Sequence, residues 1–242
     1  MRRGAPAVST RQGIPPVCKA PALSGDGLPV RLTAWLAASV FALLMGSIAL
    51  ETVRLQPLTH HMSTHILLMN VIAPLIAHGV AAGGQRLPAW LSTGASLCLA
   101  TAAQLVTLWA VHIPVLLESV SGVAGGNRMV QGLLLVTALW FWTSALSQRG
   151  VMRWRALLAL LVTGKLFCLL AALIVFAPRP LYELVEHTHR GATDSAPLAD
   201  QQLAGLLMIS TCPLTYVLEA IVISAIWLKE LGARSAPAAR AD

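Results

Sequence analysis

Six long stretches of mostly apolar residues, separated by short polar segments, dominate the sequence. They cover residues 32–50, 61–82, 89–117, 129–146, 154–177 and 203–228. A helix that crosses the hydrocarbon core of a bilayer needs about 20 consecutive, mostly apolar residues, and each stretch approaches or exceeds that length. We therefore expect an all-α, polytopic membrane protein, built as a bundle of about six transmembrane helices.

The composition argues against a soluble protein. The chain is 56% hydrophobic and only 11% charged, whereas a soluble domain usually carries about 25% charged residues. The formal net charge of +7 does not indicate a nucleic-acid partner, because the basic residues stand between the apolar stretches and not along one polar face. We expect the chain to have the lipid bilayer, and no nucleic acid, as a partner.

The two ends of the chain differ from its middle. Residues 1–31 and 229–242 are rich in Pro, Gly, Ala, Ser and Arg, a composition typical of disorder. We predict a disordered N-terminal segment over residues 1–31, a six-helix transmembrane domain over 32–228 and a tail over 229–242. The polar N-terminal part is too long for a typical cleaved signal, so we expect the first apolar stretch to remain as a signal anchor.

The basic residues orient the bundle. Of the 17 Lys and Arg residues, twelve fall in segments on the side of the N-terminus, four fall on the opposite side, and Lys165 falls in mid-membrane. The side richer in Lys and Arg usually faces the cytoplasm. We therefore expect both termini, with the segments 1–31 and 229–242, to be cytoplasmic.

This orientation gathers most histidines at one membrane face. Six of the seven histidines fall at the outer face, although they are far apart in the sequence. They are His60, His61, His65, His112, His187 and His189, and the acidic residues Glu51, Glu183, Glu186 and Asp200 join them. Only His78 falls toward the cytoplasm.

The second apolar stretch opens with a pattern that suits copper. His61 and His65 lie four residues apart, so on a helix they share one face. Met69 continues that face and Met62 flanks it. Imidazole and thioether together suit copper, and thioether favours Cu(I). Alternatively, the histidines are polar tips at the membrane interface, bonded to water and backbone. No His-Glu-x-x-His motif supports a zinc hydrolase, and His112 adds a third candidate ligand.

Two charged residues fall inside the apolar stretches. Lys165 and Glu219 lie at similar depths, and ionisable groups inside a bilayer are usually paired. We expect them to form a buried ion pair that holds two helices in register, in preference to a proton or ion path. The four cysteines (Cys18, Cys98, Cys168 and Cys212) are widely spaced without a Cys-x-x-Cys motif. We expect them to be small packing residues, with a copper relay through Cys168 and Cys212 as a weaker alternative.

Three segments carry a resemblance to a known family. Residues 61–69 read His-Met-Ser-Thr-His-Ile-Leu-Leu-Met, Trp109 precedes His-Ile-Pro at 112–114 with Phe-Trp at 141–142, and Leu-Tyr at 181–182 precedes Asp-Gln-Gln-x-x-Gly-x-x-Met at 200–208. Over about residues 32–228 the chain resembles the polytopic cytochrome c oxidase assembly factors required for caa3-type oxidase, the caa3-type CtaG family. The resemblance implies a role in maturing a haem–copper oxidase, at its copper centre.

The chain departs from the family pattern at three positions. The resemblance implies two further histidines, four residues apart, at the start of the fourth stretch, where this chain has Asn127 and Gln131. It also implies Trp where this chain has Ile209. Amide side chains are much poorer copper ligands than imidazole, so the departures indicate a divergent member in which the metal site is reduced, relocated or lost.

Together these inferences predict an assembly factor that is not an enzyme. It would be a multi-pass protein of the cell inner membrane that binds Cu(I) transiently at the outer face. The predicted ligands are His61, His65, His112, Met62 and Met69, and the predicted second-shell or structural residues are His60, Asp200, Gln201, Asn127 and Gln131. For Asp200 we expect a cap on the sixth helix in preference to a contact that orients a ligand.

The expected partners are haem–copper oxidase subunits and a copper donor protein. Three alternatives stay open at this point. The first is a haem-binding membrane redox protein with His65 and His112 as axial ligands. The second is a transporter that uses Lys165 and Glu219, and the third is a metal-free scaffold for oxidase subunits.

Overall fold

The computed structural model describes residues 27–53, 55–83, 87–182 and 196–235. Within these ranges, six helices are long and apolar enough to cross a membrane. They span residues 32–52, 57–82, 94–111, 126–146, 150–175 and 197–233. The prediction of an all-α polytopic bundle is therefore confirmed.

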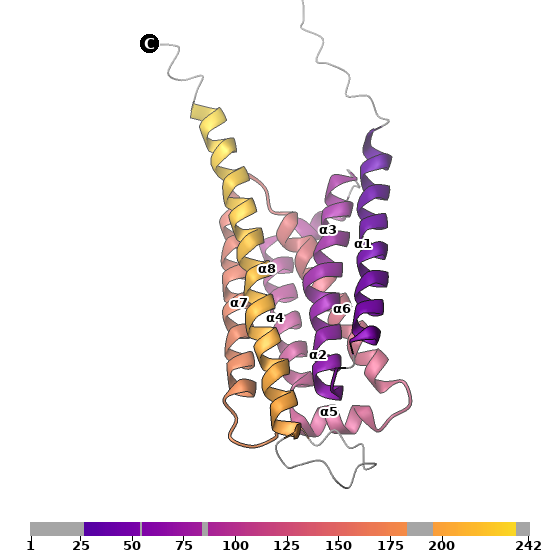
Figure 1. Cartoon of the computed structure of the whole chain (residues 1–242). Helices are drawn as coiled ribbons and strands as arrows, with labels where there is room; N and C mark the ends of the chain where they lie inside the picture. The colour runs from indigo at the N-terminus through magenta and orange to yellow at the C-terminus, as the bar shows by residue number, and fades with distance from the viewer. Residues whose placement is uncertain (1–26, 54, 84–86, 183–195, 236–242) are drawn as a thin grey trace, which may run out of the picture.

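The chain runs through its helices in the following order (Figure 1). They are α1 (Gly27–Thr52), α2 (Pro57–Ile66), the π-helix η1 (Leu67–Ile72), α3 (Ala73–Ala82), the 3-10 helix η2 (Ala89–Ser92), α4 (Gly94–Val111), α5 (Pro114–Ser121), α6 (Gly126–Leu146), the 3-10 helix η3 (Gly150–Met152), α7 (Arg153–Val175) and α8 (Ala196–Ser235). In this order α2, η1 and α3 together make the second membrane crossing.

The helices at the two ends are longer than the sequence predicted. Because α1 begins at Gly27 and α8 continues to Ser235, residues 27–31 and 229–235 are helical, and the prediction of disorder was wrong for them. Good helix formers such as Lys, Glu, Leu and Ala extend α8 past its apolar part. The other residues of the predicted disordered segments lie outside the described ranges.

The third apolar stretch, predicted as one long helix over residues 89–117, is divided. The helix α4 ends before His112, whose backbone (φ −94°, ψ 0°) leaves the helical region. Pro114 then starts α5, because proline has no N–H to continue the helical ladder and disfavours helix at the residue before it. The short helix α5 lies across the end of the bundle (Figure 1).

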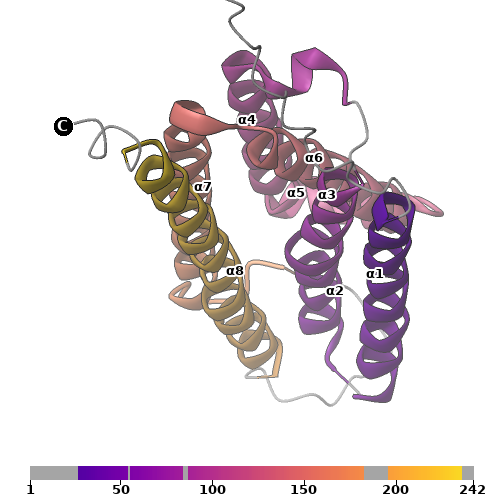
Figure 2. The same ribbon diagram turned by 90° about the horizontal axis from the view of Figure 1, so that it is seen from above.

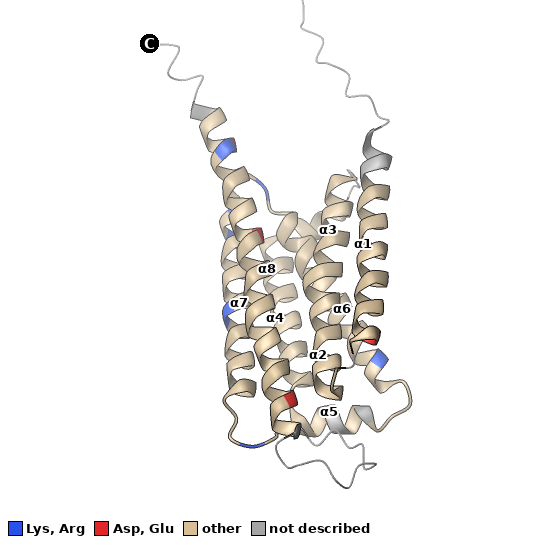
Figure 3. Cartoon of the chain, in the orientation of Figure 1, with Lys and Arg blue, Asp and Glu red and all other residues tan. Residues whose placement is uncertain are grey.

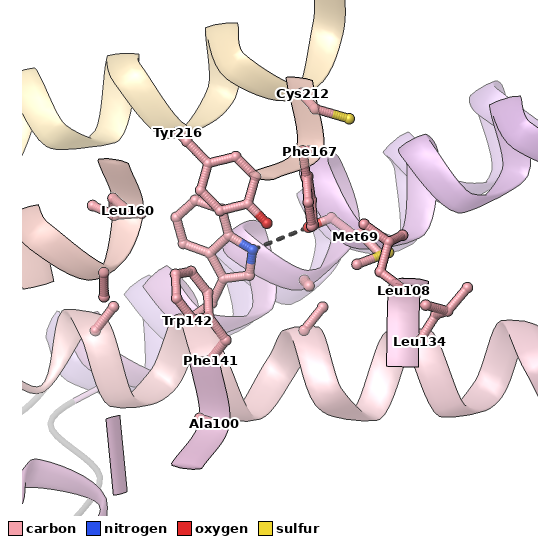
Figure 4. Packing of buried hydrophobic residues seen from close by; sticks show 14 of the residues in the cluster. Met69, Ala100, Leu108, Leu134, Phe141, Trp142, Leu160, Phe167, Cys212 and Tyr216 are labelled. Atoms are coloured by element: carbon pink, nitrogen blue, oxygen red, sulfur yellow. Dashed lines mark hydrogen bonds between the residues drawn. The ribbon is translucent and has the colours of Figure 1, made fainter. Parts of the chain in front are cut away.

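The π-helix η1 follows from the proline that comes next in the chain. The N–H of Ala73 bonds to the carbonyl of Leu68, five residues back, and Pro74 has no N–H to donate. The carbonyl of Met69 is thereby free to accept a hydrogen bond from Nε1 of Trp142, at 3.0 Å (Figure 4). Single π-turns inside α-helices frequently occur at functional sites.

The core lies between η1, α3, α4, α6, α7 and α8 and is built on aromatic rings. Trp142 and Tyr216 stack with ring centroids 5.1 Å apart, and Phe167 meets Tyr216 edge to face. Gln104 donates to the Tyr216 hydroxyl at 2.8 Å. Gly205 brings α8 close to α7, since a Cβ there would lie 2.6 Å from Val175 Cγ2.

The described charges lie mostly toward the two ends of the bundle, and its middle is nearly uncharged (Figure 3). The helix α1 stands at the edge of the bundle beside α3 (Figure 2). It begins at the end of the bundle where α8 finishes. The other end, formed by the starts of α2, α6 and α8, the end of α4, and α5, is called the histidine end below.

Candidate metal centre

Three imidazoles from two distant segments meet at the histidine end. His61 and His65 lie one turn apart on α2, and their ring centroids are 4.2 Å apart. The ring centroid of His112, which caps the end of α4, lies 6.0 Å from that of His65. These are the three residues that the sequence predicted as nitrogen ligands, and the structure brings them together.

Asp200 fixes the helix that carries two of these rings. Its carboxylate accepts hydrogen bonds from the backbone N–H groups of Leu58 and Thr59, at 2.9 and 3.0 Å, and from the Thr59 hydroxyl. These N–H groups belong to the first turn of α2, where helices lack internal partners. The prediction that Asp200 caps the sixth helix was therefore wrong, because Asp200 lies inside α8 and caps the start of α2. It orients the imidazoles only through α2.

Polar neighbours set the protonation of two rings. Nδ1 of His65 lies 2.9 Å from Oε1 of Gln131, and Nδ1 of His112 lies 2.7 Å from the carbonyl oxygen of Leu108. Both partners accept, so each Nδ1 carries the proton and each Nε2 keeps its lone pair. Tyr182 also donates to the backbone carbonyl of His112 at 2.9 Å, which holds the end of α4.

The Nε2 atoms of His61, His65 and His112 are all buried without a hydrogen-bond partner among the described residues. Burial lowers the pKa of His112 to about 4, so at neutral pH this imidazole is uncharged, as a metal ligand must be. Burial also raises the pKa of Tyr182 to about 12. Buried polar atoms are usually satisfied, so each of these three unsatisfied lone pairs is a candidate donor to a metal ion.

Two spaces adjoin these rings. The first, called the outer pocket below, is open, measures about 780 Å³ and lies between α2, α5 and α6. His60, His61 and Asn127 line it. The second, called the inner cavity below, measures about 10 Å³, about enough for one water-sized guest. His65 and His112 border it, and the His61–His65 contact therefore stands between the two spaces.

Sulfur atoms and aromatic rings complete the inner cavity. Its lining residues are Met62, His65, Ile66, Met69, Asn70, Leu108, His112, Phe167, Met208 and Cys212. Met62 and Met69 were predicted as softer donors, and Cys212 was part of the weaker copper-relay alternative with Cys168, which does not line the cavity. The sequence did not indicate Met208 or Asn70 as part of the site. Figure 4 shows Met69, Phe167 and Cys212 on the same side of the stacked Trp142 and Tyr216.

The donor set limits which ions fit. Among the described residues, no three His, Cys, Asp or Glu side chains stand close enough together to hold a metal. A site here must therefore include thioethers, which suit Cu(I) and not the hard divalent ions. With buried imidazole nitrogens and thioethers around one small cavity, the residues fit Cu(I).

Comparison with known protein families shows to which family the chain belongs. The model of a family described as "Cytochrome c oxidase caa3 assembly factor (Caa3_CtaG)" matches residues 22–230, nearly the whole chain. The chain belongs to this family. No curated protein matches it, and no solved structure does. It is therefore a multi-pass membrane protein of a cytochrome c oxidase assembly-factor family.

The two positions at which the family resemblance implies histidines lie beside the imidazoles of the candidate metal centre. Asn127 hydrogen-bonds to His61 and Gln131 bonds to His65. The departures noted in the sequence therefore fall on the candidate metal centre itself. Here the amides orient imidazoles at the positions where the resemblance implies further ligands.

Gln201 is a buried residue that connects α8 to the end of α7. Its side chain is fully buried (0% exposed). It accepts from the N–H of Leu181 at 2.6 Å and donates to the carbonyl of Ile174 at 3.1 Å. It thereby ties the end of α7 to α8 and contacts no imidazole. His60 borders the outer pocket, and His187 and His189 lie outside the described residues.

The predicted ion pair between Lys165 and Glu219 was wrong. Glu219 bonds to Nε2 of His78 at 3.0 Å, and His78 stacks on Trp35 of α1. Lys165 is exposed on α7 and has no acidic partner among the described residues. Glu219 bonds to a residue of α3 while Lys165 is exposed on α7, because the direction in which each side chain points depends on how the helices pack.

Proposed function

We propose that this caa3 assembly factor binds Cu(I) transiently at the histidine end and passes it to the copper centre of a haem–copper oxidase. One observation carries the proposal. Three imidazoles from α2 and the end of α4 meet with buried, unpartnered Nε2 atoms. The proposed ligands are His61, His65 and His112, with Met62 and Met69 as softer donors.

The chemistry of the site suits a carrier and not a catalyst. The lining of the inner cavity is neutral at neutral pH and contains no carboxylate, so we propose no enzymatic reaction. Asn127 and Gln131 replace further imidazoles by amides, and a smaller ligand set lets an ion leave more readily. The outer pocket gives a copper donor and the oxidase subunit room to reach His61.

The basic residues support a placement of the histidine end outside the cytoplasm. Twelve of the 17 Lys and Arg residues belong to the opposite side, which by the positive-inside rule faces the cytoplasm. We propose the cell inner membrane as the location. Copper would then be received and delivered at the outer face.

The haem-binding alternative has less support. The inner cavity that His65 and His112 share measures about 10 Å³, whereas pockets for organic ligands usually measure about 300–1,000 Å³. The space thus suits one ion. The transporter alternative loses its basis with the Lys165–Glu219 pair.

Copper loading of the purified full chain tests the proposal. The chain is loaded with Cu(I) under anaerobic, reducing conditions, and bound copper is measured for the wild type and for a His61→Ala, His65→Ala double variant. We expect the double variant to lose most of the copper. The control is His78→Ala, which removes a histidine outside the candidate metal centre.

Equal copper content in the wild type and the double variant would contradict the proposal and favour a metal-free scaffold. A Soret band that shifts on reduction would favour haem instead. In the host, deletion of the gene should lower oxidase activity and oxidase copper. A deletion strain with full activity and normal copper would count against the role in oxidase assembly.

A further inference from the structure

The inner cavity holds more sulfur than the sequence assigned to the site. Met62 lies on α2 and Met69 on η1, and α8 adds Met208 and Cys212 to the same lining. All four side chains are buried, with at most 4% of their surface exposed. Three thioethers and one thiol around a space for one atom form a soft donor set, distinct from the imidazoles that meet the outer pocket.

The geometry of α8 aims both of its sulfur residues at this space. Met208 and Cys212 are four residues apart, so they lie on one face of the helix, one turn from each other. Asn70 on η1 donates from Nδ2 to the sulfur of Cys212 at 3.0 Å. The π-turn that places Asn70 thus also fixes the position of the thiol.

Charge distinguishes Cys212 from the other lining residues. Cu(I) carries one positive charge, and a charge buried in an apolar interior needs a partner of opposite sign. Among the residues that line the inner cavity, Cys212 is the only acid that can become an anion. The carboxylates of Asp200 and Glu219, which also lie on α8, already bond to the start of α2 and to His78. The amide donor of Asn70 would stabilise a thiolate.

We propose that Cys212 and Met208 bind Cu(I) in the inner cavity, together with Met69, as a sulfur position beneath the imidazoles. This inference rests on the proposed function, since it takes Cu(I) as the cargo. When the ion binds, the S–H bond of Cys212 breaks and an Sγ–Cu bond forms. The proton leaves to the solvent, copper stays in the +1 state, and the cavity remains neutral overall.

The arrangement gives the ion two adjoining positions. Cu(I) enters from the outer pocket at His61, passes the His61–His65 contact and comes to rest among the sulfur ligands. Because no three His, Cys, Asp or Glu side chains converge in the described part of the chain, the imidazoles and the thiol do not form one ligand set. At the sulfur position α8 supplies two ligands, Met208 and Cys212, and the thioether of Met69 supplies the third.

X-ray absorption at the copper edge of the Cu(I)-loaded full chain tests the sulfur position without any substitution. We expect copper–sulfur scattering in the wild type. A spectrum with nitrogen or oxygen neighbours alone would overturn the inference and remove Met62 and Met69 from the proposed ligands, while Cu(I) binding by the imidazoles of the histidine end would stand. A wild type that binds no Cu(I) would instead contradict the proposed function itself.

Substitutions then identify the sulfur atoms. In competition with a chromophoric Cu(I) chelator, Met208→Leu and Cys212→Ser should each lower Cu(I) affinity at least about tenfold, the lower end of what loss of a metal-site partner costs. The matched control is Cys168→Ser, which alters a free cysteine on α7 outside the cavity lining. Unchanged affinity in both test variants would overturn the inference.

Proton release separates a ligand from a packing residue. In weakly buffered detergent solution, Cu(I) loading of the wild type should release one proton more than loading of Cys212→Ala. Equal release by the two proteins would exclude a thiolate ligand. Size-exclusion profiles and circular dichroism of each variant establish that it is folded before copper is added.

Discussion

The two ring nitrogens of His65 have different surroundings. Nδ1 lies 2.9 Å from the amide oxygen of Gln131, and Nε2 is buried without a partner. The amide oxygen accepts only, so it keeps the proton on Nδ1 and the lone pair on Nε2. A residue that binds no metal thereby determines which nitrogen is available to one.

Removal of this partner should weaken copper binding. In Gln131→Leu the His65 ring loses the acceptor that fixes its tautomer, and loss of such a contact usually lowers metal affinity about 10- to 100-fold. Chelator competition with Cu(I) measures the change. The control is Gln148→Leu, a buried glutamine beyond the other end of α6 that bonds only to backbone carbonyls. Similar affinities in the two variants would argue against an orienting role for Gln131.

Histidines at the two amide positions should strengthen the site. Asn127 and Gln131 lie beside His61 and His65, so the double variant Asn127→His, Gln131→His adds two imidazoles to the candidate metal centre. We expect Cu(I) affinity to rise about tenfold, equivalent to about 1.4 kcal/mol, and release to a chelator to slow. A lower affinity than in the wild type would show that these positions do not face the ion.

Single residues also show what the sequence can and cannot predict. The spacing of His61 and His65 on one helix sufficed to predict that their rings meet, because helix geometry relates residues four apart. Met208 and Cys212 have the same spacing, but only the packing of α8 against α2 and η1 brings them to the cavity. For Lys165 and Glu219, the similar depth expected from the sequence did not lead to a contact, since the two side chains point in different directions.

At the scale of the element, the position of α2 depends on a contact with α8. The first-turn N–H groups of Leu58 and Thr59 bond to Asp200, 142 and 141 residues away in the chain. The sequence indicated a cap at Asp200 from its place at a helix start, but a partner so distant leaves no local signal. The contact joins the helix that carries the imidazoles to the helix that carries Met208 and Cys212.

Loss of this cap should destabilise the bundle. In Asp200→Ala two backbone N–H groups of α2 lose their acceptor, and loss of a helix cap costs about 0.5–2 kcal/mol. The apparent Tm of the purified protein in detergent should fall. Asp200→Asn keeps one acceptor oxygen and should fall less, whereas equal Tm values for Asp200→Ala and the wild type would contradict the role given to the carboxylate.

Two prolines account for most of the differences between predicted and observed elements. Pro114 divides the third apolar stretch, and hydropathy alone does not register this break because both pieces are apolar. Pro74 leaves the second crossing intact but shifts its hydrogen bonding at η1. Hydropathy does not show the π-turn either, and the hydrogen bond from Trp142 to the carbonyl of Met69 that this turn leaves free is a tertiary contact.

For the molecule as a whole, the sequence predicted the architecture more completely than it predicted the residues of the candidate metal centre. Apolar length gave six crossings and the family resemblance covered nearly the same residues. An even number of crossings places the start of α1 and the end of α8 on the same side of the membrane, and in the structure they lie at the same end of the bundle. Which side faces the cytoplasm rests on the distribution of charge and stays a prediction.

Labelling of intact cells can test that orientation. A cysteine introduced by Ala124→Cys lies at the histidine end, and one introduced by Val151→Cys lies at the opposite end, and both positions are exposed. A membrane-impermeant maleimide should label the first and not the second, with the wild type as the background for native cysteines. Labelling of Val151→Cys alone would place the candidate metal centre on the cytoplasmic side.

The small size of the inner cavity has a consequence for which ions can cross from the outer pocket. A space of about 10 Å³ admits a bare ion but not one that still carries its shell of water. Mg²⁺ gives up its water reluctantly and requires several oxygen donors, whereas the only side-chain oxygen in the lining of this cavity belongs to the Asn70 amide. Dehydration at the His61–His65 contact would then act as a filter: abundant hard cations stay in the pocket, and a weakly hydrated, sulfur-seeking ion continues inward.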